Sequence, residues 1–118
     1  MQSERSRTTG AAAFQLAAAV DHYLTSVCDL DRLEPDAMTG RLEPLHAAMR
    51  AVRIHWAASC ALHGACVELL IGHSELAYQL SMTRGRTGRT RLRQLLDTQV
   101  RRAADLLRLA SEPLAVCR

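Results

Sequence analysis

The chain contains no lysine and no asparagine, and only 3% of its residues are aromatic. All fifteen basic residues are therefore arginines, a bias that fits GC-rich coding better than a physical requirement, so arginine is weak evidence for function here. With so few rings, a core must be built from Leu, Ala, Val and Met side chains. Because β-branched residues are scarce and do not alternate with polar ones, the composition argues against a sheet.

Long apolar runs are also missing, since no segment approaches the 18 or more uncharged residues of a membrane helix. The Ala-rich run 10–20 after Arg5 and Arg7 faintly imitates a signal peptide, but Gln15 interrupts it and Asp21 ends it. The four cysteines lack the short spacings of a disulfide framework. We therefore expect a cytoplasmic protein with free thiols and no membrane association.

What remains is rich in Ala and Leu, which are strong helix formers, so we predict an all-α helical bundle. The 118 residues suffice for one domain with a single core. We predict a disordered tail at 1–8, a helical-bundle domain at 9–112 and a C-terminal tail at 113–118. The outer helices are expected at about Thr9–Leu30 and Thr90–Ala110.

Between them, residues 41–82 contain no proline after Pro44 and keep one apolar periodicity, which predicts a single helix of about 40 residues. Apolar positions on two sides widen its apolar arc to roughly 200°, well beyond an ordinary surface helix. The apolar seam repeats at strict 3-4 spacing: Leu42, Leu45, Met49, Val52, Trp56, Ser59, His63, Cys66, Leu70, His73, Ala77 and Leu80.

Two arrangements could cover such a helix. In the first, three helices with a long central one are completed by dimerisation. In the alternative, the chain reverses near Gly64 and forms a monomeric four-helix up-down bundle. A reversal normally takes about 2–5 loop residues, and Gly64 stands alone among helix formers, so we favour the first.

Three seam residues, Ser59, His63 and His73, are polar. They are expected either to hydrogen-bond across an interface and fix its register, or to form a small ligand pocket or pH-sensitive contact. The predicted interface or pocket comprises Trp56, Ser59, His63, Cys66, Leu70 and His73.

We predict no cofactor and no metal. If a metal were bound, its ligands would come from Cys60, His63 and Cys66, which have helical i, i+3 spacing. These three residues spread over about 120° of a helix, so one helix could offer only a pair of them.

We also predict no catalytic residues. The pairs Arg50-x4-His55 and Arg41-x4-His46 resemble the Arg-x4–6-His motif of HEPN ribonucleases, which are small helical bundles. With fifteen arginines and five histidines, roughly two such matches are expected by chance. A HEPN-like ribonuclease is therefore a remote alternative.

Charge is distributed unevenly. Residues 1–83 hold six arginines against nine acids and residues 84–118 hold nine against three, giving about −3 and +6. An Arg-rich turn at 84–90 and the helix after it could bind nucleic acid or another polyanion, and a solvated loop is the alternative. The candidate residues are Arg84, Arg86, Arg89, Arg91, Arg93, Arg101 and Arg102.

Together these patterns favour a bacterial, non-enzymatic helical adaptor or regulatory protein that acts through protein–protein interfaces, as a homodimer with a possible further partner. Polyanion binding is the first alternative. Small-ligand or metal binding in the bundle core is the second.

Overall fold

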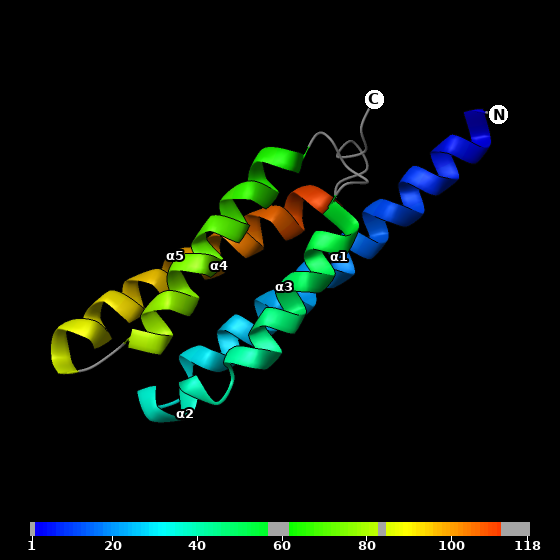
Figure 1. Cartoon of the computed structure of the whole chain (residues 1–118). Coiled ribbons are helices and arrows are strands. Elements are labelled where there is room, and N and C mark those ends of the chain that lie inside the picture. The colour runs from blue at the N-terminus through cyan, green and yellow to red at the C-terminus, as the bar shows by residue number, and fades with distance from the viewer. Residues whose placement is uncertain (1, 57–61, 83–84, 112–118) are drawn as a thin grey trace.

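The computed structural model describes residues 2–56, 62–82 and 85–111, and it confirms an all-α helical bundle. Five helices follow one another along the chain (Figure 1): α1 (Gln2–Asp31), α2 (Pro35–Thr39), α3 (Leu42–Trp56), α4 (His63–Met82) and α5 (Gly85–Ser111). No strand occurs in these three segments. None of their helices is both long and apolar enough to cross a membrane.

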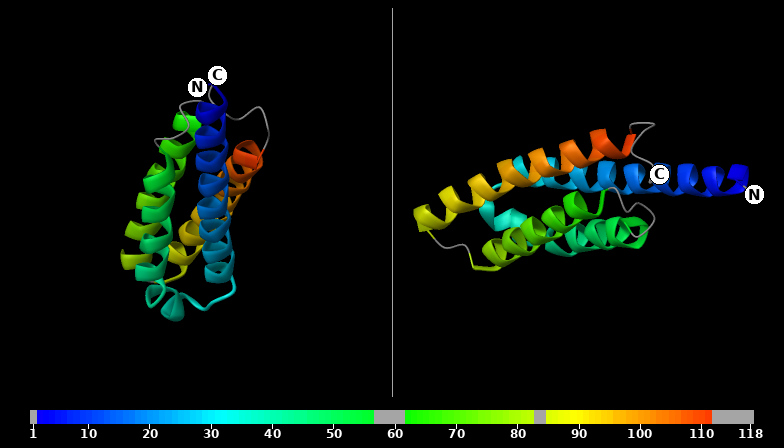
Figure 2. Two further views of the ribbon diagram at one scale, coloured as in Figure 1. Left: turned by 90° about the vertical axis from the view of Figure 1, so that its right-hand side faces the viewer. Right: turned by 90° about the horizontal axis from the view of Figure 1, so that it is seen from above.

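The four long helices lie side by side (Figure 2). Helix α1 packs against α3 and α5, and α4 packs against α5 and α3, so the four surround one core. Helices α3 and α4 run antiparallel. Trp56, the last residue of α3, bonds to His63, the first residue of α4. His46, near the start of α3, bonds to His73, in the middle of α4. Later residues of α3 therefore lie beside earlier residues of α4.

The predicted 40-residue helix is therefore wrong, because α3 ends at Trp56 and α4 begins at His63. The same apolar periodicity arises from one continuous helix and from two antiparallel helices whose apolar faces both point inward. The four-helix alternative fits the described residues. Gly64 is the second residue of α4 and therefore lies within a helix.

This arrangement changes what the wide apolar arc implies. Helices α1 and α5 cover the inner faces of α3 and α4 within one chain. A second protomer is not needed to bury the seam, so an argument for dimerisation must rest on another surface.

Two helices start earlier than predicted. Helix α1 begins at Gln2 instead of about Thr9, and α5 begins at Gly85 instead of about Thr90, so most of the expected Arg-rich turn is helical. Residues 112–118 lie outside the described part of the chain. The division into one domain and two tails stays a prediction.

The core is aliphatic, as the composition predicts, and all four long helices contribute to it. On α1 the most deeply buried positions follow 3-4 spacing. They are Leu16, Val20, Tyr23, Val27 and Leu30, each at most 1% exposed. Burying one such side chain contributes about 1.5–3 kcal/mol to stability. Within the described segments, two polar residues are buried among these apolar ones, namely His73 and Gln99.

Candidate functional site

A row of hydrogen-bonded polar side chains crosses the core and takes one residue from each long helix. Tyr23 on α1 lies with its Oη 2.9 Å from Nδ1 of His73 on α4. His73 Nε2 is 2.9 Å from Nδ1 of His46 on α3. Gln99 on α5 donates from Nε2 to Tyr23 Oη at 2.9 Å. We call these four residues the polar chain.

The donors and acceptors of the polar chain can be arranged in one direction. Gln99 uses its two amide hydrogens for Tyr23 Oη and for the Leu69 carbonyl, 2.8 Å away. Tyr23 accepts one bond and so donates its own hydrogen to Nδ1 of His73. The hydrogen of a neutral His73 then resides on Nε2 and is donated to His46. With both imidazoles neutral, each bond of the polar chain then joins one donor to one acceptor.

Burial disfavours a charge on His73 and on Tyr23. His73 is 5% exposed, and its pKa is lowered from 6.5 to about 4, first by burial and second by the neighbouring His46. Tyr23 is fully buried, and burial raises the pKa of its hydroxyl, against a smaller opposite effect of the Gln99 hydrogen bond. A protonated His73 would place a positive charge in the apolar interior, so lowering the pH destabilises this packing.

Gly72 allows α5 to place two side chains against α4. A Cβ atom at this position would clash with Gln99 Oε1 and with Arg102 Nη1. Gln99 Oε1 is buried and has no hydrogen-bond partner within the described segments. The polar chain therefore depends on a glycine at position 72 for the space that Gln99 occupies.

The predicted interface or pocket residues do not gather in one place. Trp56 donates from Nε1 to Nδ1 of the exposed His63 at 2.8 Å, near the ends of α3 and α4. Cys66 is buried and Leu70 is partly buried. His73 belongs to the polar chain, and Ser59 lies outside the described residues.

Sequence reasoning noticed His73 as a polar residue on an apolar seam but missed its partners. Gln99 lies seven residues after Leu92 and four before Ala103, both buried on the same face of α5. That spacing indicates that the Gln99 amide lies on the buried face of the helix. Nothing local to α3 indicated that His46 would reach His73.

The suggested metal ligands also lie in different environments. His63 is exposed and bonded to Trp56, Cys66 is buried, and Cys60 lies outside the described residues. Among residues 2–56, 62–82 and 85–111, no group of three or more His, Cys, Asp or Glu side chains could hold a metal ion.

Cys66 is expected to be much less reactive than Cys28. Burial raises the pKa of the Cys66 thiol to about 11, while Cys28 is a partly exposed free cysteine. Only thiolates alkylate, so at about pH 8 iodoacetamide should modify Cys66 at least about tenfold more slowly. Peptide mass spectrometry measures both rates. Unfolding in guanidinium should make them equal, and equal rates in the folded protein would contradict the burial of Cys66.

The predicted polyanion-binding arginines are distributed around α5. Arg93 forms an ion pair with Asp31 of α1, and Arg102 lies against Gly72. Arg84 and the side chain of Arg86 lie outside the description, and the exposed members are Arg89, Arg91, Arg93 and Arg101. Polyanion binding stays a prediction.

The two HEPN-like pairs do not form sites in the described part of the chain. Arg50 pairs with Glu43 at 3.3 Å, and no hydrogen bond or ion pair joins it to His55. Arg41 likewise has no such contact with His46, which bonds to His73. The motif therefore adds no support for a ribonuclease.

The outer face of α4 carries a second feature that sequence reasoning missed. Val67, Ile71, Tyr78 and Met82 repeat at spacings of four and seven residues and so share one face of the helix. Ile71 is 53% exposed, Tyr78 64% and Met82 57%, and Val67 is partly buried. Ser74 occupies the same face. We call these five residues the outer α4 stripe.

No protein-family model, curated protein or solved structure matches this chain. Its function must be inferred from the residues themselves.

Proposed function

We propose that this chain is a non-enzymatic helical adaptor or regulatory protein whose first partner is a second copy of itself, docked through the outer α4 stripe. The supporting observation is the row of three large apolar side chains that are each more than half exposed. Isolated exposed apolar residues are normal on protein surfaces, but an aligned row is typical of an interaction site.

The spacing of the stripe suits a two-fold interface between antiparallel helices. The stripe is symmetric about the point between Ser74 and Glu75. Val67 and Met82 are equally far from this point in the sequence, and so are Ile71 and Tyr78. A two-fold axis at this point would pair Val67 with Met82 and Ile71 with Tyr78. The small Ser74 would lie at the centre, where the two helices approach most closely.

The serines of this region can be buried at low cost. Ser74 donates its hydroxyl hydrogen to the Leu70 carbonyl at 3.1 Å, and Ser81 donates to the Ala77 carbonyl at the same distance. Neither serine would therefore leave an unpaired donor in a dimer interface.

One edge of the stripe opposes association. Glu68 and Glu75 are exposed beside it, and a two-fold axis of this kind brings the same edge of both copies together. Their repulsion should keep the dimer weak at low ionic strength, and added salt should strengthen it by screening.

Sedimentation equilibrium over roughly 5–500 μM protein tests the proposal at low and high salt. The double variant Ile71→Glu with Tyr78→Glu should weaken dimerisation at least tenfold, because four carboxylates would enter the interface. Phe14→Glu is the matched control, since Phe14 is 74% exposed on α1, away from α4. A wild-type monomer throughout, or equal weakening by Phe14→Glu, would overturn the proposal.

Cross-linking tests the orientation. In a background with Ser at Cys28, Cys60 and Cys117, Ser74→Cys should form an interchain disulfide under mild oxidation, because position 74 lies at the proposed axis. Met82→Cys should not, since the two copies of position 82 lie at opposite ends of an antiparallel pair. Cross-linking at both positions would indicate parallel helices instead.

A further inference from the structure

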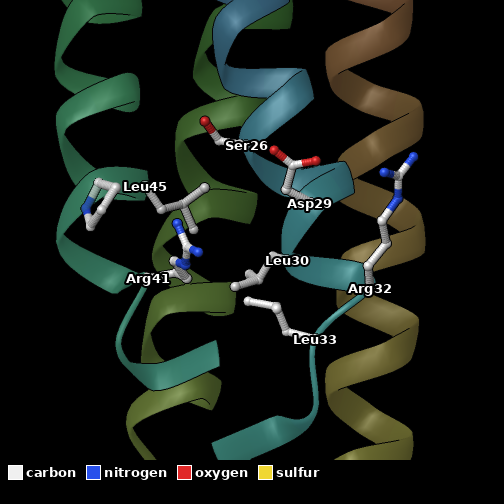
Figure 3. Close-up of a pocket in the computed structure, with 8 residues that line it drawn as sticks. Ser26, Asp29, Leu30, Arg32, Leu33, Arg41 and Leu45 are labelled. Atoms are coloured by element: carbon white, nitrogen blue, oxygen red, sulfur yellow. The ribbon is translucent and has the colours of Figure 1, made fainter. Parts of the chain in front are cut away.

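A pocket of about 300 Å³ lies at the end of the bundle where α1 finishes and α3 begins (Figure 3). Its apolar part comes from Leu30, Leu33, Pro44 and Leu45. Leu30 and Leu45 are buried, and Leu33 is half-buried. Volumes of ligand pockets start at about 300 Å³, so this one suits a small molecule and is too small for a nucleotide.

Two opposite charges line this pocket, each at the unfavourable end of a helix. Asp29 lies in the last turn of α1, where carbonyl groups make the helix end negative, and Arg41 directly precedes α3, whose end is positive. Acids favour helix starts and bases favour helix ends, so both charges cost stability. Residues that break a local preference in this way are expected at functional sites.

Neither charge is compensated within the described segments. The carboxylate of Asp29 and the guanidinium of Arg41 have no ion pair with each other or with another residue. Two acids close by in the sequence are engaged elsewhere, since Asp31 pairs with Arg93 and Glu43 pairs with Arg50.

The side chains are arranged around one space. Figure 3 shows Asp29 and Ser26 on the α1 side, Arg41 and Leu45 on the α3 side, and Leu30 and Leu33 between them. Arg32 also lines the pocket but is directed away from this group. The Ser26 hydroxyl donates to the His22 carbonyl at 3.0 Å, so its lone pairs can still accept a hydrogen bond.

We propose that this pocket binds a small zwitterion with an apolar tail, that is, a free α-amino acid with an aliphatic side chain. The ligand carboxylate contacts Arg41 and the positive end of α3. Its ammonium group contacts Asp29 and Ser26 at the negative end of α1. The tail packs on Leu30, Leu33 and Leu45. This site does not depend on dimerisation through the outer α4 stripe.

Isothermal titration with matched probes tests the proposal on the full chain. L-Leucine should bind at least tenfold more tightly than 4-methylpentanoate, which lacks the ammonium group, or 3-methylbutylamine, which lacks the carboxylate. Glycine, which lacks the tail, should also bind at least tenfold more weakly. No heat with leucine at millimolar concentrations would overturn the proposal. So would equal binding of acetate or phosphate, which would indicate a simple anion site.

Variants separate a binding role from a structural one. Arg41→Gln and Asp29→Asn should each weaken leucine binding at least tenfold, while Arg53→Gln, an exposed arginine of α3 outside the pocket, should leave it unchanged. Because both charges oppose their helix dipoles, Arg41→Gln and Asp29→Asn should melt at or slightly above the wild-type temperature. Lower melting temperatures with unchanged binding would assign these residues a structural role and overturn the proposal.

Discussion

Lowering the pH from about 7 to about 4 is expected to reduce the free energy of unfolding by about 3 kcal/mol through His73 alone. In the unfolded chain this residue takes up a proton near its ordinary pKa of 6.5, whereas in the folded chain it does so only at about 4. Between these values the unfolded state binds more protons, so stability falls by about 1.4 kcal/mol per pH unit. Above 6.5 the contribution is fully present, and below about 4 no more is lost.

Urea unfolding across this pH range measures the slope, and a paired substitution isolates the contribution of His73. Tyr23→Phe combined with His73→Leu removes the hydroxyl donor and its acceptor together. The buried Gln99 then loses the acceptor of one amide hydrogen, which lowers stability equally at every pH and leaves the slope unaffected. The double variant should lose most of the slope between pH 6.5 and 4. His22→Gln changes an exposed histidine of α1 and should retain the wild-type slope. An unchanged slope in the double variant would show that other groups cause the acid sensitivity.

Gly72→Ala is expected to destabilise the fold by about 1–3 kcal/mol, although alanine is the better helix former by about 1 kcal/mol. The new Cβ would clash with Gln99 Oε1 and with Arg102 Nη1. Arg102 is partly exposed and can move aside. Gln99 is fully buried and bonded to Tyr23 and Leu69, so its displacement breaks the polar chain.

A double-mutant cycle with Gln99→Ala measures this clash. Gln99→Ala destabilises on its own, but the double variant should be at least about 1 kcal/mol more stable than the sum of the single effects. Gly64→Ala is the matched control, because nothing lies within 4 Å of a Cβ at that position of the same helix. It should be neutral or stabilising by up to about 1 kcal/mol. Additive effects of Gly72→Ala and Gln99→Ala would contradict the proposed contact.

The two predictions concern the same feature, since His73 and Gly72 are neighbours on α4 and the polar chain links all four long helices. Buried polar networks tend to fix one arrangement of packed elements at some cost in stability. Here each partner comes from a different helix, so the network is formed only when all four helices are in register. The sequence suggested a register-fixing role for His73 between two chains, and within one chain this role stays a prediction.

The composition and periodicity were sufficient for the helical class and for much of the core. The spacing of Leu16, Val20 and Val27 is enough to identify them as inward positions, because a helix repeats its faces every 3.6 residues whatever it packs against. The same periodicity led to the wrong continuous helix, since the apolar phase runs on from Trp56 to His63. Local sequence does not show which element packs against a helix face, so it cannot distinguish one long helix from two helices that fold back on each other.

The candidate sites needed information that no local pattern contains. Partners in the polar chain are separated by 27, 50 and 76 residues, and they meet only through the order and register of the packed helices. The same holds for Asp29 and Arg41, which line one pocket because α1 ends beside the start of α3. Backbone preferences act over a few residues, and they therefore predict helices and their apolar faces. Which side chains share an interior or a pocket depends on how those faces pair in space.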